Sequence, residues 1–203
     1  MEQFRGKVLP KTAVITLGKI YSGATTQAKI LAEEYDFYHV STSAILRDLA
    51  KQKDQRGIRI KAILESGQYV PDTMMMELLS EVVSKQREAS GFVFDWYPRT
   101  IQQKLMLVDM FKRLKIDIRF LFVELNVSQA ELARRKKNHP AVEKTPKETH
   151  DRASEFEKTE HLIYSLKEKE RGSIVTVNVP DHASPADVFV MIQQEWARAY
   201  VRK

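Results

Sequence analysis

The chain contains no cysteine among its 203 residues. This absence excludes disulfides and thiolate metal sites, and we expect an intracellular location in a reducing compartment, either the cytoplasm or an organelle interior. No apolar run approaches the roughly 18–20 residues needed to span a bilayer, so we expect no membrane partner. The first seven residues, MEQFRGK, lack the apolar segment of a secretory signal, and we do not expect secretion. The five histidines are not spaced as metal ligands.

The remaining composition is that of a folded domain with a basic surface. Hydrophobic residues make up 43% and charged residues 30% of the chain, which is typical of one compact domain. The net charge of +6 suits an anionic ligand without identifying it. The basic run at 134–137 (RRKK) is open to two interpretations, a nucleic-acid contact or a solvated helix face beside a nucleotide site. We favour the solvated helix face.

Short apolar runs alternate with longer helical patterns along the chain. The runs are typical of strands buried on both faces of a parallel sheet, and they lie at 13–17, 37–40, 91–95, 118–123 and 173–178. The helical patterns lie at 26–35, 42–52, 57–66, 72–88, 100–114, 128–138, 147–170 and 185–200. This alternation predicts a doubly wound, five-stranded parallel α/β sheet. We expect Thr42 and Ser128 to cap their helices and Pro185 to begin the last one.

A glycine-punctuated loop follows the first predicted strand. Gly18 and Gly23 have the spacing of the phosphate-binding pattern G-x-x-x-x-G-K-[ST], and Thr25 lies at its hydroxyl position. Backbone N–H groups and the positive end of the next helix converge on an anion in such a loop. The lysine of the pattern is replaced by Ala24. The sequence therefore predicts a phosphate loop without its usual charge.

Further segments give the chain a family resemblance. They are STSAILR at 41–47, ESGQYVPD at 65–72, GFVFDWYPRT at 91–100 with Gln103, and SPADVF at 184–189. In this order and spacing, over about residues 12–197, the chain resembles the adenylate kinases and their nucleoside monophosphate kinase relatives. The resemblance implies a P-loop nucleoside monophosphate kinase-like fold in a single domain, 1–203. It implies a core at about 12–40, 71–137 and 151–200, an AMP-binding helical flap at about 41–70, and a short lid at about 138–150.

The resemblance also implies roles for individual residues. The phosphate loop would comprise Gly18, Ser22, Gly23, Thr25 and Thr26. The residues matching those that hold AMP are Thr42, Arg47, Gly67, Val70, Arg99 and Gln103. Asp95 and Arg135 match catalytic positions, with Arg152 as a further candidate, and Thr25 and Asp95 match the residues that hold Mg²⁺, Asp95 through water. Mg²⁺ with ATP is the implied cofactor if the donor site works; otherwise we expect none.

The part of the predicted site that would bind ATP, the phosphate donor, departs from the family pattern. Ala24 cannot pair with phosphates, and Tyr21 is costly if its position requires a positive φ. Trp96 stands where the family usually has glycine, which puts an indole close to the path of the phosphates. In the predicted lid and the helices that flank it, His139, Pro140 and Asp151 fall at or near arginine positions of the family, and Arg152 is one residue out of register.

We therefore expect a degenerate adenylate kinase-like protein, a pseudoenzyme with weak or absent activity. It would bind AMP or a related mononucleotide and act as a nucleotide-sensing or structural component of a larger protein assembly. One alternative is an active kinase (ATP + AMP to 2 ADP) in which Lys19, Lys29 or Arg152 replaces the loop lysine. A second is a nucleic-acid or protein-binding module using 134–137 and the basic C-terminal residues Arg198, Arg202 and Lys203.

Overall fold

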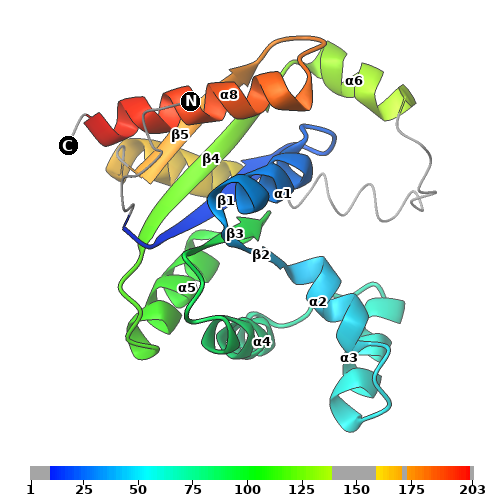
Figure 1. Ribbon diagram of the computed structural model, residues 1–203. Helices are drawn as coiled ribbons and strands as arrows, with labels where there is room; N and C mark the ends of the chain where they lie inside the picture. The colour runs from blue at the N-terminus through cyan, green and yellow to red at the C-terminus, as the bar shows by residue number, and fades with distance from the viewer. Residues whose placement is uncertain (1–9, 139–158, 171–172, 202–203) are drawn as a thin grey trace.

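The computed structural model describes residues 10–138, 159–170 and 173–201, and it contains one sheet of five parallel strands (Figure 1). The strands are β1 (Thr12–Gly18), β2 (Tyr38–Ser41), β3 (Gly91–Asp95), β4 (Arg119–Val127) and β5 (Ile174–Val179). Their order in the sheet is β2-β3-β1-β4-β5, so the predicted α/β class is confirmed. β1 pairs with β3 on one side and with β4 on the other, which makes it the central strand.

Helices lie between the strands as the sequence predicted. They are α1 (Ala24–Tyr35), α2 (Thr42–Leu49), α3 (Gln55–Glu65), α4 (Asp72–Lys85), α5 (Ile101–Arg113), α6 (Gln129–Asn138), a helix at 159–169, and α8 (Pro185–Val201). The first part of the helix predicted at 147–170 lies outside the described residues, as does the predicted lid beyond Asn138. His139, Pro140, Asp151 and Arg152 lie outside them as well. Within the described residues, no helix is long and apolar enough to cross a membrane.

Each face of the sheet has its own apolar core. One core is rich in aromatic residues and includes Phe92, Phe94 and Phe111, with Leu162 and Leu166 from the helix at 159–169. The other is built from aliphatic side chains of β1, β4 and β5 packed against α1 and α8. Figure 1 shows α1 and α8 on one side of the sheet and α4 and α5 on the other. Covered on both faces, the strands carry the continuous apolar runs seen in the sequence.

Two of the three predictions about where helices begin are confirmed. Ser128 accepts a hydrogen bond from the Glu131 N–H at 3.1 Å, and Pro185 is the first residue of α8, as predicted. The prediction of Thr42 as a cap is wrong. The cap of α2 is Ser41, whose hydroxyl accepts from the Ala44 N–H at 3.4 Å, while Thr42 is the first helical residue. β2 runs on through Ser41, which moves the helix start by one position.

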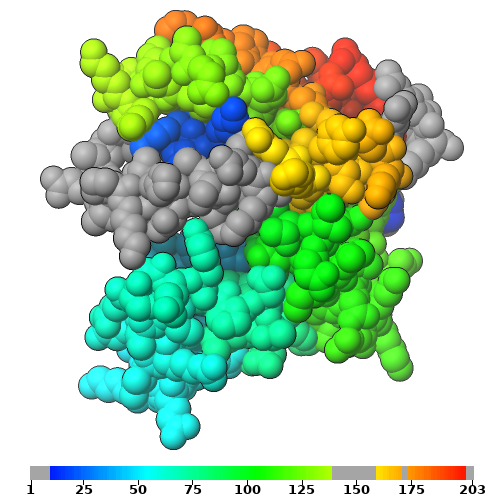
Figure 2. Space-filling view, turned by 180° about the vertical axis from the view of Figure 1, so that it is seen from behind, coloured from blue at the N-terminus to red at the C-terminus, as the bar shows by residue number. Residues whose placement is uncertain are grey.

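The helices α2 and α3 project from the sheet at the lower right of Figure 1, within the range of the predicted flap. Arg56 of α3 forms a two-pronged ion pair with Glu81 of α4, at 3.0 and 2.8 Å, which ties this projection to the core. On the opposite view, α5 lies beside the helix at 159–169 (Figure 2), and Lys104 pairs with Glu170 across that contact. Pairings between elements thus support both the projecting helices and the helix that follows the predicted lid.

Candidate nucleotide-binding site

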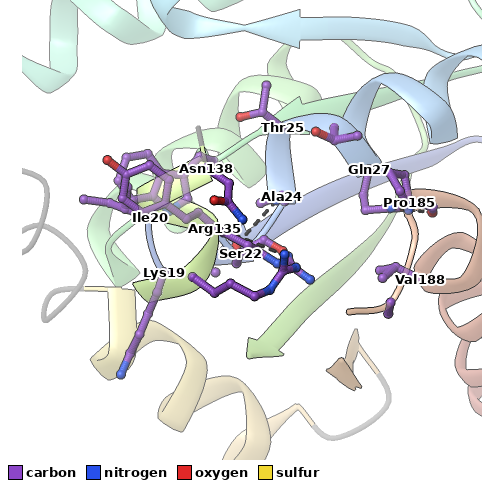
Figure 3. Close-up of a pocket in the computed structure, with 17 residues that line it drawn as sticks. Lys19, Ile20, Ser22, Ala24, Thr25, Gln27, Arg135, Asn138, Pro185 and Val188 are labelled. Atoms are coloured by element: carbon purple, nitrogen blue, oxygen red, sulfur yellow. Dashed lines mark hydrogen bonds between the residues drawn. The ribbon is translucent and has the colours of Figure 1, made fainter. Parts of the chain in front are cut away.

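The loop after β1 borders a cavity with a volume of about 490 Å³. The cavity is lined by every residue from Gly18 to Gln27, with Trp96, residues of α6, and Ala183, Pro185 and Val188 (Figure 3). Gly18 has no room for a side chain, because a Cβ there would lie 2.4 Å from the Ser22 hydroxyl. A loop that leads from a central strand into the start of α1 presents N–H groups to an anion, as a phosphate site requires.

Two large residues adopt backbone conformations that favour glycine. Tyr21 in the loop has φ 69° and Trp96 after β3 has φ 57°. The positive φ expected to make Tyr21 costly is therefore present. A left-handed conformation costs a residue with a Cβ roughly 1–2 kcal/mol. At both positions the backbone has a conformation that glycine adopts easily, although the residue present carries a large side chain.

No charge enters the loop at the lysine position. Ala24 is the first residue of α1, is 8% exposed, and ends in a methyl group. Lys19 extends away from Ser22 and Ala24 (Figure 3), and it borders a second, smaller cavity with Glu160 and Lys167. The structure therefore does not bring Lys19 into the position of the missing ammonium group.

Arg135 reaches the loop from α6. Its Nη1 donates to the carbonyl oxygens of Ser22 at 2.8 Å and Tyr21 at 3.3 Å. Its Nε donates to Glu131 at 2.7 Å, and Arg134 donates to the same carboxylate through two nitrogens, each at 2.7 Å. These bonds hold the pKa of Glu131 well below its usual range. The buried carboxylate therefore offsets part of the positive charge beside the cavity.

Thr25 and Asp95 meet where α1 begins and β3 ends. The Thr25 hydroxyl donates to Asp95 Oδ1 at 3.0 Å. Burial raises the pKa of Asp95, while the hydrogen bond from Thr25 opposes that rise. A hydroxyl and a carboxylate are hard oxygen ligands that fit Mg²⁺, which keeps several waters when bound to proteins. Among the described residues, no group of three or more acidic or histidine side chains could hold a metal on its own.

His39 of β2 faces the same carboxylate. Its Nε2 lies 3.9 Å from Asp95 Oδ2, and within the described parts of the chain this buried nitrogen has no hydrogen-bond partner. Burial lowers the pKa of His39 despite the neighbouring carboxylate. Sequence reasoning did not single out His39, because only the pairing of β2 with β3 places it here.

The residues after β3 form a polar cluster on the other flank of the loop. Arg99 Nε donates to the Trp96 carbonyl at 3.0 Å, and its guanidinium carbon lies 4.4 Å from the centre of the Trp96 ring. The Arg99 N–H donates to Gln103 Oε1 at 2.9 Å, and Gln103 Nε2 donates to Asp72 Oδ1 at 2.8 Å. The structure thus links Gln103 to Arg99 and to Asp72, which lies 31 residues earlier and which was not assigned to the site from the sequence.

The other residues predicted for the AMP site come from the projecting helices and the segment after them. Thr42 is buried at the start of α2, and Arg47 is exposed near the end of that helix. Gly67 has φ 69°, so the turn after α3 uses its conformational freedom. Val70 packs against the same apolar core as Trp96. Thr26 lines the cavity beside the loop but is exposed.

A parallel sheet with a glycine loop after its central strand, and a threonine–aspartate pair at the loop, is the architecture of the P-loop kinase class of folds. The chain belongs to the adenylate kinase family, since the family model described as adenylate kinase matches residues 16–172.

Curated relatives agree with this assignment. The chain is 39% identical to an adenylate kinase of Rhizobium meliloti (strain 1021) over 127 residues, 62% of this chain and 65% of the relative. It is 35% identical to an adenylate kinase of Methanothrix thermoacetophila over 122 residues, 60% of this chain and 56% of the relative. The matched segments thus span somewhat less than two thirds of the length of these relatives.

Proposed function

We propose that the protein is a degenerate member of the adenylate kinase family that keeps a site for AMP or a related mononucleotide but has impaired ATP binding and phosphoryl transfer. One observation carries the proposal: the loop that lines the cavity has Ala24 at the lysine position, while the side chain of Lys19 extends away from Ser22 and Ala24 (Figure 3). On the side where the phosphate acceptor AMP would bind, in contrast, Arg99 is hydrogen-bonded to both Gln103 and Trp96.

The size of the expected loss in catalytic rate supports this proposal. Phosphoryl transfer depends on positioning and charge stabilisation, and one arginine finger is worth roughly 10³–10⁵ in rate. Removing a single preorganised donor costs on the order of 10²–10³. Losing the loop lysine and arginines of the lid would remove most catalysis, although such losses are not additive. Arg135, Asp95 and, just after the lid, Arg152 would be the remaining catalytic candidates.

The proposed acceptor site has the chemistry of a phosphate and a base. The guanidinium groups of Arg47 and Arg99 suit a phosphate dianion, and the Gln103 amide suits a base edge with a donor and an acceptor. We propose that Thr42, Gly67 and Val70 complete this site, with the flap at about 41–70 and the lid at about 138–150. A protein that binds AMP and transfers phosphate poorly would serve as a nucleotide-sensing or structural part of a larger assembly.

Thr25 and Asp95 would hold Mg²⁺ if a nucleoside triphosphate binds, with Asp95 acting through water. The ion would then neutralise phosphate charge. Gly18, Ser22, Gly23 and Thr26 would supply the loop around the phosphates. A helix start can hold an anion without a lysine, so the proposal allows a donor site that is occupied but inert.

Calorimetric titration tests the proposal. The protein is titrated with AMP, with ATP, and with a bisubstrate dinucleotide that spans both sites, all with Mg²⁺ present. We expect AMP to bind and the bisubstrate to gain no affinity over AMP. Ordinary turnover with ATP and AMP in a steady-state assay would overturn the proposal.

A second candidate is an active kinase in which another cation replaces the lysine. Two observations favour it: the Thr25–Asp95 pair is intact, and the loop cavity has about 490 Å³ of space. Lys29 is one candidate cation, since burial raises the pKa of Asp95 and the charge of Lys29 acts against that rise. This candidate predicts a measurable rate that is lost on replacing Lys29, Lys19 or Arg152. The relatives named adenylate kinase are consistent with it.

A nucleic-acid or protein-binding module has less support, because Arg134 and Arg135 are both bound to Glu131. It predicts binding that falls steeply with salt and ignores mononucleotides.

A further inference from the structure

The side-chain amide of Gln103 has a chemically defined orientation. One neighbour, the backbone N–H of Arg99, can only donate, so the amide oxygen must face it. The other neighbour, the Asp72 carboxylate, accepts, so the amide nitrogen must face it. Turning the amide over would place nitrogen against an N–H and oxygen against a carboxylate, and both hydrogen bonds would be lost.

After these two hydrogen bonds, the side-chain amide of Gln103 still has hydrogen-bonding groups that a ligand can use. An amide has two N–H donors and an oxygen with two lone pairs, so within the described part of the chain one donor and one lone pair stay available to a ligand. Their order is fixed, because the nitrogen is held on the Asp72 side and the oxygen on the Arg99 side. A base bound against Gln103 in one pose must therefore present its own donor to the oxygen and its own acceptor to the nitrogen.

We infer that Asp72 is a specificity-determining residue, which fixes the Gln103 amide so that the site prefers a 6-aminopurine monophosphate to a 6-oxopurine one. The inference rests on the proposed AMP site. A 6-aminopurine presents an amino donor at position 6 and an acceptor at N1. A 6-oxopurine presents the reverse, an acceptor at position 6 and a donor at N1. The second pattern needs the turned amide, which Asp72 and the Arg99 N–H both oppose.

A purely structural role for Gln103 is the competing explanation. Thr100 caps α5 by accepting from the Gln103 N–H at 3.1 Å, and Gln103 reaches back toward the N–H that precedes the cap, much as in a capping box. Such a role explains the Arg99 contact but not the one to Asp72, which begins a different helix, α4. The two explanations differ in what a change at Asp72 does to base preference.

The test compares AMP with IMP, its 6-oxo counterpart, by calorimetric titration of the full chain. The variant Asp72→Asn keeps the size of the side chain but lets its own amide serve either orientation of Gln103. We expect the ratio of AMP affinity to IMP affinity to fall about tenfold, the effect of one hydrogen bond. Asp72→Ala removes the acceptor altogether and should lower the same ratio. Asp109→Asn, which removes the same charge from an exposed site on α5, should leave the ratio unchanged.

Each outcome is decisive. If Asp72→Asn weakens both nucleotides equally, Asp72 is structural and the inference is overturned. If the unchanged protein binds AMP and IMP equally well, the orientation of Gln103 sets no preference and the inference fails while the AMP site stands. If the unchanged protein binds neither, the proposed AMP site itself fails, and the inference falls with it.

Discussion

The guanidinium group of Arg99 lies over the indole of Trp96, with its central carbon 4.4 Å from the ring centre. The same arginine donates from Nε to the Trp96 carbonyl at 3.0 Å. Trp96, which departs from the family pattern, thus supports Arg99, which follows it. The indole, which lines the cavity beside the loop, is also the platform on which the proposed AMP-binding arginine rests.

Replacing Trp96 should therefore weaken AMP binding. A cation–π contact is worth about 0.5–2 kcal/mol, so Trp96→Gly should lower AMP affinity roughly 2–30-fold in calorimetric titration. Glycine relieves the positive φ at this position, so the backbone has no need to shift. Trp96→Phe keeps an aromatic ring under Arg99 and should retain most of the affinity. Tighter AMP binding by the glycine variant would instead mean that the indole obstructs the phosphate.

Restoring the loop lysine should act on the donor side alone. Ala24→Lys places an ammonium group at the first residue of α1, beside the cavity. A hydrogen bond to a charged group contributes about 1.5–3 kcal/mol, so affinity for Mg²⁺–ATP should rise roughly 10–150-fold while AMP affinity stays constant. Ala24→Met, which adds a long side chain without charge, is the matched control. Equal ATP affinity in the lysine and methionine variants would show that Tyr21 and the rest of the loop prevent phosphate binding.

In the protein without ligands, the ionised carboxylate of Asp95 should lower the free energy of unfolding. Burial raises its pKa above the ordinary value of 3.8, so the folded state binds protons more tightly than the unfolded state. Its contribution to stability is then fully present below that value and is lost as pH rises through the folded pKa. Asp95→Asn should raise the melting temperature at pH 7, by about 2–4 °C for each kcal/mol gained, and the gain should vanish below pH 3.8. A variant that melts lower at pH 7 would show that the ionised carboxylate is stabilising here.

Glu131 should have the opposite pH dependence. Its pKa is lowered by Arg134 and Arg135, so its contribution to stability is present above the ordinary value of 4.5 and is lost as pH falls through the folded pKa. Glu131→Gln should lower the urea midpoint at pH 7, with a smaller difference from the unchanged protein in acid. Glu33→Gln, an exposed site on α1, serves as the control. An equal loss at all pH values would mean that packing rather than charge explains the effect.

The sheet and the phosphate loop could be predicted because their signals are local in the sequence. The apolar run at 13–17 and the glycine spacing that follows it place β1, the loop and α1 in order. The cost of Tyr21 could also be foreseen, since its place in the loop pattern raised the question of a positive φ.

Contacts between distant segments could not be predicted in this way. Asp72 meets Gln103 because α4 and α5 pack side by side, and no local pattern encodes that packing. Likewise, Arg135 was matched to a catalytic position, but its bonds to the carbonyls of Tyr21 and Ser22 join residues that are 114 and 113 positions apart. The one-residue error at Ser41 arose because β2 runs directly into α2.

The central position of β1 has a consequence for how this fold can diverge. β3 leaves the sheet on one side of the loop and carries Asp95 to Gln103, whereas β4 leaves it on the other side and leads into α6 with Glu131 and Arg135. Trp96 from the first side and Arg135 from the second line one cavity with the loop, so substitutions on the two sides are expected to be coupled through it. A change on either side of β1 therefore alters the surroundings of the other, and the two sides of the loop cannot vary independently.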